Sequence, residues 1–596
     1  MDLELEKEIN EAVEYLKGVS NDKLDFRLMD PIAKMMLVSL LHESQKIKDY
    51  INSVDEKIVE RFCEDFIPRR EVAAIPALTI IEPKHRQKKD LEPIYIGENA
   101  VFTYKLDDNK RIINYIPIFK TLCVPMQNMY VLTNGKLYDG DRAIDVSTDK
   151  LNSVWVGIST KAEIESLKHL SLFISGTDGV LPEHIYVGMN AFELEFSNMM
   201  KMEDIDFVPP FDSQQSSSQF FSIIDTWKEC LMNMNNKSLL YITDSVSDRD
   251  VFRAHAYPKV FEKWLEEDTL KSFADNTIWL RLDFPSDYIV PETTTVKINV
   301  LPVVNVDVNS VTLTQSSPIA KLEKQDSSFF LQILETSNAM TKQGFNHLMD
   351  DVVVRDFDST CYHKGALYRD VRNIYNHFID DYYAFIEYNG IKDGETITQL
   401  RDIINKIGKS VGTYSSKYSY DSGTYVMKNI NQCQSTTPVK VLYATTLGKI
   451  GNIPVVGAKL ENKKLPSIEK DVNIIVNALC GADKAGIDEK YENLRYYSLT
   501  NDRLYTKKDI EAFLRKEVIA EFGKCEYKHI FIRQNIEGAV GQAKLQRGLY
   551  ITIEFKDKKN YDRANDSSFS HRIQQKIISR SCIAMPIIVN LKYLGV

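Results

Sequence analysis

The chain has 596 residues, of which 84 are acidic and 74 basic, so its formal net charge at pH 7 is −10. This acidic balance argues against a nucleic-acid-binding protein, which usually carries a basic stripe. Hydrophobic residues make up 43% and charged residues 27% of the chain, which excludes bulk disorder. At about 100–200 residues per domain, the length predicts three or four domains.

The expected compartment follows from the N-terminus, the hydropathy and the cysteines. The start, MDLELEKEIN, lacks the basic residues and apolar core of a signal peptide, and no apolar stretch approaches the roughly 18–20 residues of a membrane span. The eight cysteines form no CxxC pair, which is typical of reduced, mostly buried thiols. They stand at Cys63, Cys123, Cys230, Cys361, Cys433, Cys480, Cys525 and Cys582. We therefore expect a cytoplasmic protein without direct membrane insertion.

The first predicted element is a long helix. Asp30 and Pro31 form a helix start, no glycine or proline follows from Ile32 to Ile67, and Pro68 ends the run. Apolar residues recur in steps of three and four, which places them on one helix face. A helix of this length needs a partner surface, so we interpret the stripe as an interaction or core face: Ile47, Ile51, Val54, Ile58, Phe62 and Phe66.

The middle of the chain favours strands. Val101–Leu106, Ile278–Phe284 and Val296–Val300 alternate apolar and polar residues, the pattern of a half-buried strand. The polar stretch FDSQQSSSQ at 211–219 indicates a loop or linker, and helices are expected at 220–231 and 251–265. A helical hairpin is predicted over 366–407, with its turn at residues 389–394, and a Ser-, Tyr- and Gly-rich loop follows it.

The last hundred residues predict a compact α+β module. Thr506 and Asp509 resemble a capping box, and the helix that follows has apolar positions at Ile510, Phe513, Leu514 and Val518. Strands are expected at 529–536, 549–556 and 587–594, with a second helix at 570–583.

The predicted fold class is therefore α+β multidomain, and five parts are expected along the chain. They are an N-terminal helical segment (1–74), a β-rich domain (75–210), a mixed α/β domain (220–320), a part with the helical hairpin and β segments (321–500), and the C-terminal α+β module (501–596).

The search for catalytic motifs is mostly negative. The sequence contains no complete P-loop and no GxGxxG, GxSxG or HExxH motif. Cys361 and His363 lie close together, but no second Cys/His pair stands at the spacing of a zinc site. One match is Asp356-Phe-Asp358-Ser-Thr360, which resembles the DxDx[TV] loop of haloacid-dehalogenase-like phosphatases. That chemistry needs the loop at the end of a central strand in a doubly wound sheet, with two aspartates beside magnesium. The favoured interpretation is a strand end followed by a turn, so we expect neither an enzyme nor a cofactor or metal.

Three segments together resemble TssF, also called VasA, the baseplate subunit of type VI secretion systems. The first is residues 30–70 with the strand Ile75–Pro83. The second, and the most specific, is the segment Ile298–Asn305 with Pro318 downstream, which resembles the family's PVVNLF signature and its Pro-Ile pair. Its motif residues here are Pro302, Val303, Val304, Asn305 and Pro318. The third segment is 504–596, which is similar to the C-terminal module of phage baseplate wedge proteins.

The sequence departs from the family pattern in two segments. Val306 and Asp307 replace the usual Leu-Phe, and Arg69-Arg70-Glu71 stands where better-known members carry an aromatic residue and prolines. These departures resemble a divergent, Bacteroidetes-like branch.

The resemblance implies a structural role without catalysis. TssF pairs with a second TssF copy and with TssG in a wedge, and wedges form a ring around the VgrG spike hub. The ring meets TssK, which links it to the membrane complex, and TssE, which links it to the sheath. It thus implies a cytoplasmic protein that the assembled baseplate recruits to the inner membrane. Two alternatives stay open: a wedge protein of a phage or phage-like contractile tail, and the phosphatase.

Overall fold

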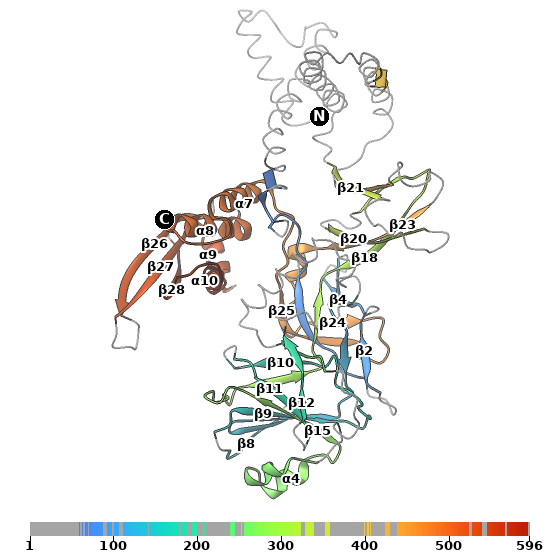
Figure 1. Cartoon of the computed structure of the whole chain (residues 1–596), viewed down its shortest axis with the longest axis vertical. Coiled ribbons are helices and arrows are strands. Elements are labelled where there is room, and N and C mark those ends of the chain that lie inside the picture. Colours follow the sequence, from blue (N-terminus) through green and yellow to red (C-terminus); the bar gives the residue numbers. More distant parts are fainter. Residues whose placement is uncertain are drawn as a thin grey trace, which may run out of the picture. The chain divides into compact units, whose positions relative to one another are not determined.

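Figure 1 shows the computed structural model of the chain. The described residues are 71–198, 239–244, 256–338, 352–357, 423–428 and 438–593, with short gaps, and isolated positions at 59–68, 208, 252 and 399–406. The predicted helix at 220–231 lies outside them. So do the predicted long helix and hairpin, apart from a few helical positions at 59–66 and 399–406. The chain divides into two compact units: residues 1–62, 313–322 and 349–437 form the first, and the rest forms the second.

A closed six-stranded barrel lies in the second unit. Its order is β1 (Leu78–Glu82), β17 (Leu301–Val304), β4 (Ile112–Pro117), β3 (Phe102–Lys105), β24 (Lys459–Asn462) and β25 (Asp471–Leu479). The strands come from three of the five predicted ranges. Strand β1 is central to the closure, because Leu78 pairs with Val304 on one side and Ile80 with Val476 on the other. The five-part division of the chain stays a prediction.

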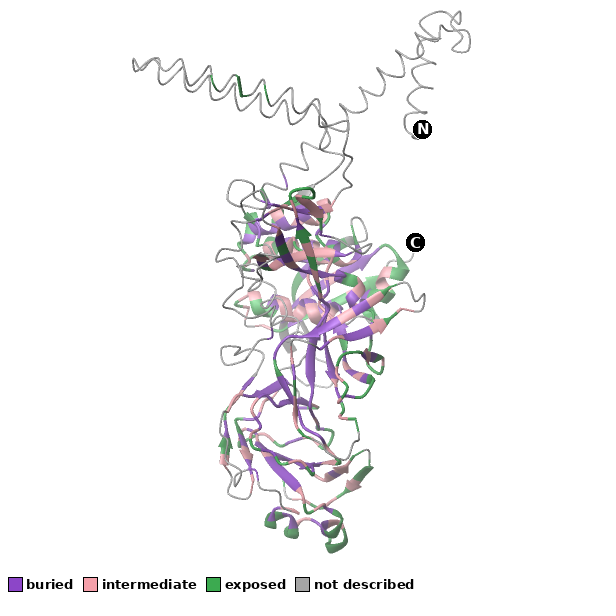
Figure 2. Cartoon of the chain, turned by 90° about the vertical axis from the view of Figure 1, so that its right-hand side faces the viewer, coloured by how far each residue is buried: buried purple, intermediate pink, exposed green. Residues whose placement is uncertain are grey.

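A two-layer β-sandwich belongs to the same unit. Its seven-stranded sheet has the order β12 (Phe192–Leu194), β11 (His184–Val187), β15 (Thr277–Asp283), β9 (Ser153–Ser159), β6 (Asn128–Thr133), β7 (Lys136–Asp139) and β8 (Arg142–Asp145). Its four-stranded sheet has the order β13 (Phe196–Asn198), β14 (Leu239–Ile242), β10 (Ser171–Ser175) and β16 (Thr295–Ile298). Buried aliphatic residues of both sheets form one core. Figure 2 shows buried residues along these strands.

A short helical cap covers part of the outer face of the seven-stranded sheet. It consists of the 3₁₀ helix η3 (Lys259–Lys263) and helix α4 (Glu267–Ser272). Phe261 packs edge-on against Trp279, with ring centroids 4.9 Å apart. The predicted helix at 251–265 is therefore wrong in extent. Pro258 precedes η3 in an extended conformation, and proline cannot donate the hydrogen bond that would carry a helix through this position.

Three further small sheets lie outside the C-terminal module. One has the order β18 (Asp307–Leu313), β23 (Val439–Thr446) and β20 (Phe329–Asn338), and another pairs β2 (Ile94–Ile96) with β5 (Thr121–Cys123). The third, in the first unit, has the order β19 (Ile319–Lys321), β22 (Gly423–Lys428) and β21 (Val352–Phe357).

The C-terminal module matches its prediction closely. Helices α7 (Ile487–Thr500), α8 (Lys507–Phe522), α9 (Lys558–Asp566) and α10 (Phe569–Arg580) accompany a sheet of β26 (Tyr527–Gly538), β27 (Leu545–Phe555) and β28 (Ile587–Tyr593). The capping box is confirmed, because the Thr506 hydroxyl accepts a hydrogen bond from the amide of Asp509. Helix α9 was not predicted. Helix α7 precedes residue 501 yet belongs here, since Tyr496 packs on Phe513 of α8.

The cysteines follow the prediction only in part. Cys63 and Cys123 are buried free thiols, whereas Cys582 is free and exposed. Cys480 is disulfide-bonded, so the prediction of a reduced thiol is wrong at this position. No helix in the described part of the chain is long and apolar enough to cross a membrane.

Candidate functional site

The motif residues Pro302, Val303 and Val304 form most of barrel strand β17, and all four residues of this strand are buried. Thr79 pairs with Val303 and Ile80 with Pro302. On its other side β17 pairs with β4, where Val304 faces Ile116. The segment that most resembles the family signature is therefore an interior strand of the barrel. Pro318 lies in the first unit, where its carbonyl accepts a hydrogen bond from the amide of Lys428.

Asn305, directly after β17, is a polar node with no exposed surface. Its side-chain amide donates to the carbonyl of Asn114 at 2.9 Å. Its side-chain oxygen accepts from the Thr446 hydroxyl at 3.1 Å and from the amide of Leu447 at 2.9 Å. Its own backbone amide donates to the carbonyl of Ala77. One buried side chain thus joins strand β4 to the end of β23, while its backbone holds the residue before β1.

The packing around this node leaves no room for an extra methyl group. The 3₁₀ helix η5 (Gly448–Asn452) passes over it. A Cβ placed on Gly451 would lie 2.7 Å from the Cβ of Ala77 and 3.0 Å from the side-chain oxygen of Asn305. Glycine is therefore required for the close approach of η5.

Asp307 extends the node and is one of the two departures from the family motif. Its carboxylate accepts a 2.7 Å hydrogen bond from the Asn114 side-chain amide, whose oxygen in turn accepts from the Thr103 hydroxyl. Burial raises the pKa of Asp307, and the hydrogen bond from Asn114 only partly opposes this effect. An acid therefore occupies a position with little water to stabilise its charge.

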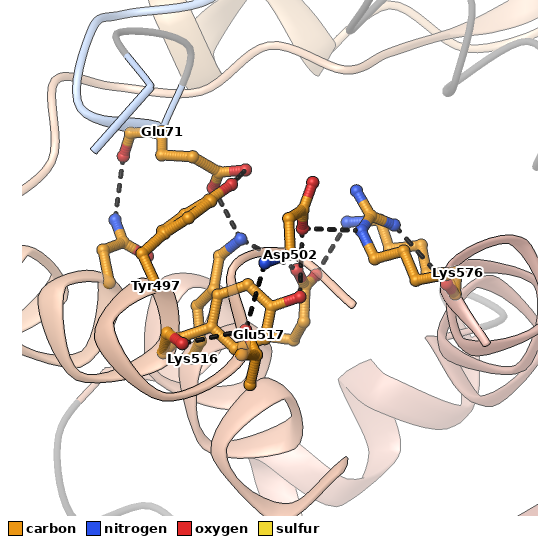
Figure 3. A network of polar contacts seen from close by, with 10 residues as sticks. Glu71, Tyr497, Asp502, Lys516, Glu517 and Lys576 are labelled. Carbon is orange, nitrogen blue, oxygen red and sulfur yellow. Dashed lines mark hydrogen bonds and ion pairs between the residues drawn. The ribbon is translucent and has the colours of Figure 1, made fainter. Parts of the chain in front are cut away.

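A second polar cluster lies where the segment before β1 meets the C-terminal module (Figure 3). The carboxylate of Glu71 accepts from Lys516 of α8 at 2.7 Å and from the Tyr497 hydroxyl of α7 at 3.0 Å. Its backbone carbonyl accepts from the Asn493 side chain at 2.9 Å. The Lys516 side chain is only 5% exposed, and its ammonium lies 4.9 Å from the ring centroid of Tyr496. Glu71 is thus held by three groups from two helices.

The cluster continues across the module to helix α10. Glu517 accepts from Lys576 at 2.7 Å and lies 3.9 Å from Lys516. Arg580 contacts Asp502, in the turn after α7, at 3.1 Å, and the Tyr496 hydroxyl donates to the same carboxylate. Three carboxylates, those of Glu71, Glu517 and Asp502, therefore face three cations, those of Lys516, Lys576 and Arg580.

The charges of this cluster are mutually stabilised. Burial alone would raise the pKa of Glu517, but Lys576 and Lys516 outweigh it and hold the pKa at about 2. Burial would likewise raise the pKa of Glu71, and the charge and hydrogen bond of Lys516 lower it instead. Both groups are therefore ionised at neutral pH.

The predicted interaction stripe is described only at its end. Phe62 and Phe66 are helical and exposed, at 47% and 64%. Val59, Cys63 and Ile67, spaced by four residues, are buried instead. Ile47, Ile51, Val54 and Ile58 lie outside the described residues, so the interaction role of the stripe stays a prediction.

The aspartate of the phosphatase alternative lies in the wrong kind of sheet. Asp356 is the fifth residue of β21 and pairs with Thr424 of β22 in an antiparallel register. Strand β22 also pairs antiparallel with β19. The nucleophile loop of that enzyme class needs the end of a parallel central strand, which these strands do not provide. Among the described residues, no group of three or more His, Cys, Asp or Glu side chains is placed to hold a metal ion.

Comparison with known proteins gives structural neighbours but no relative in sequence. No family model matches the chain, and no curated protein matches it. One similar solved structure is the type VI secretion TssK-TssF-TssG baseplate subcomplex, with a TM-score of 0.43 and 10% identity over 94% of this chain and 96% of that chain. Another is a type VI secretion baseplate complex, with a TM-score of 0.35 and 8% identity over 99% and 95%. A third is the anti-feeding prophage baseplate, with a TM-score of 0.29 and 8% identity over 98% and 70%.

Proposed function

We propose that this chain is a TssF-type structural subunit of a type VI secretion baseplate. It would link the spike hub, the sheath and the membrane complex through protein interfaces, and it would not be an enzyme. Its partners would be TssG, a second copy of the same chain, TssK, TssE and the VgrG hub. It would act in the cytoplasm and reach the inner membrane as part of the assembled baseplate.

One observation carries this proposal: the residues that resemble the family signature coincide with the node that holds the barrel together. Asn305 has four hydrogen bonds to three separate parts of the chain, and β17 is paired on both sides. Such a residue determines the fold, because an asparagine whose side-chain nitrogen and oxygen are both hydrogen-bonded in a core has few replacements. The most specific of the three resembling segments therefore includes residues that determine the barrel, and the proposed role is argued from the resemblance.

Co-expression with a TssG-like protein tests the proposal. We expect the chain to form a stable complex that elutes as one species in size-exclusion chromatography, because a wedge subunit leaves its partner surfaces uncovered when alone. A well-behaved lone monomer that ignores TssG would count against the proposal. Capture of phage-tail proteins in preference to secretion components would favour the phage-tail alternative.

A further inference from the structure

The segment Glu71–Ala77, called the connector here, leads directly into barrel strand β1 and contacts the C-terminal module on its way. Its backbone forms a bridge with the residues before α7: Ile75 and Ala482 exchange two hydrogen bonds, of 2.8 and 3.0 Å. The amide of Ala485 donates to the carbonyl of Val72. The side chain of Glu71 then reaches α7 and α8, as Figure 3 shows. The connector is thus one point where barrel and module meet.

A second contact between barrel and module is also polar. The ammonium of Lys449, in η5 over the barrel node, donates to the carbonyl of Ala520 in α8 at 3.0 Å. The amide of Lys449 donates to Asp483, in the covalent link between β25 and α7. These contacts between barrel and module are hydrogen bonds and one ion pair. Polar interfaces between parts of a chain permit relative motion, whereas large apolar interfaces oppose it.

The ion pair at this joint has a particular energetic character. Lys516 is buried in the module, and its other carboxylate neighbour, Glu517, is closer to Lys576. Glu71 therefore supplies the charge that balances Lys516. A buried pair of this kind contributes little net free energy, because desolvation of both ions offsets their attraction, yet removal of one partner alone is strongly unfavourable. Such a pair can fix the orientation of the module on the barrel. Separation of the two ions still costs little free energy, because both are hydrated again at the same time.

We infer that Glu71 is a releasable latch that sets the orientation of the C-terminal module on the barrel. With Glu71 seated on Lys516, Tyr497 and Asn493, the module has one defined position. With Glu71 withdrawn, the module pivots on the link at residues 480–486 and the connector bridge opens. This inference concerns the chain itself and does not rest on the proposed function.

Amide hydrogen exchange of the full-length chain tests the latch. The chain is measured in complex with its partner where it is not soluble alone. In Glu71→Gln, the amides of Ile75, Ala482 and Ala485 should exchange about tenfold faster or more, because Lys516 loses the charge that balances it. The amides of Ile474 in the barrel and Ile510 in α8 should keep their protection. The control is Glu511→Gln, which removes a half-buried pair with Arg515 on α8, the helix that holds Lys516, and should change the exchange of none of these amides.

A double variant separates the latch from a general loss of fold. Glu71→Met with Lys516→Met removes both ions, and we expect the three connector amides to regain protection to within about threefold of the parent chain. Two outcomes would overturn the inference. One is unchanged connector exchange in Glu71→Gln relative to Glu511→Gln. The other is faster hydrogen exchange at the barrel and module amides as well as at the connector amides, which would show that Glu71 stabilises the whole fold.

Discussion

At the scale of single residues, Asn305 shows how one buried side chain links distant segments of the barrel. Asn305 satisfies three partners through its side chain and has none of its surface exposed. Each buried polar group that loses its partner costs about 1–3 kcal/mol. Asn305→Ala should therefore destabilise the chain by about 3 kcal/mol or more, measured by chemical denaturation. Asn477→Ala is the control, because exposed Asn477 accepts a single bond, from Val456, and should cost less than about 1 kcal/mol.

At Asp307 we expect a substitution to stabilise the chain rather than destabilise it. Its pKa in the folded chain is raised by burial, so the folded state favours the protonated acid. Stability from this group is then present below its unfolded pKa and is lost as the pH rises through the folded pKa. Asp307→Asn keeps the acceptor for Asn114. It should raise the free energy of unfolding at pH 7 by about 0.5–2 kcal/mol, and the thermal midpoint should rise with it. Below the unfolded pKa the gain should disappear, and a gain that persists there would contradict the assignment.

Glu517 gives a pH dependence in the acidic range. Its folded pKa of about 2 lies below the ordinary value of 4.5, so its contribution is present above pH 4.5 and is lost as the pH falls towards 2. Thermal unfolding between pH 5 and pH 2 should therefore show a shallower loss of stability in Glu517→Gln than in the parent chain. Equal slopes in the two proteins would show that Lys576 and Lys516 do not stabilise this carboxylate.

At the scale of elements, the capping box of α8 positions the helix that holds Lys516. The Thr506 hydroxyl accepts from the Asp509 amide, and the Asp509 carboxylate accepts from the amide of Thr506. Thr506→Ala should cost about 1 kcal/mol, as for other N-cap losses, by denaturation of the full chain. Ser498→Ala is a matched control on α7, since Ser498 is exposed and bonds only its own helix. A cost no larger than the control would exclude the cap as a stabilising contact.

The elements that sequence patterns predicted correctly are those with local signals. Thr506 and Asp509 specified the start of α8, and the strands predicted at 549–556 and 587–594 match β27 and β28 within a few residues. The barrel was not predicted, because its closure pairs β1 with β17 and β25, and nothing local in LTIIE specifies those partners. Pro258 was the available signal against the predicted helix at 251–265.

The candidate sites were likewise predicted only where the sequence carries a local signal. Asn305 was found through a resemblance in its flanking residues, although its bonds to Asn114 and Leu447 have no local signal. Glu71 was noticed only as a departure from the family pattern, and its partner Lys516 was not predicted at all. A lysine within the apolar run around Phe513 and Val518 was the one available hint, because a buried lysine needs an anionic partner.

At the scale of the whole molecule, the described residues of the second unit include a barrel, a sandwich and a small α+β module, and two buried polar clusters link segments that are distant in the sequence. The Asn305 node holds the barrel, and the Glu71 cluster joins the barrel to the module. We propose that such a chain acts by holding partners in a defined geometry.

The most direct test of this central claim is purification of the tagged chain from its native cell, with mass spectrometry of its partners and the mass of the complex. We expect a stable assembly that contains more than one copy of this chain together with a TssG-like protein and other baseplate components. Recovery of a single copy without secretion or tail proteins, under conditions in which the machine is assembled, would contradict it.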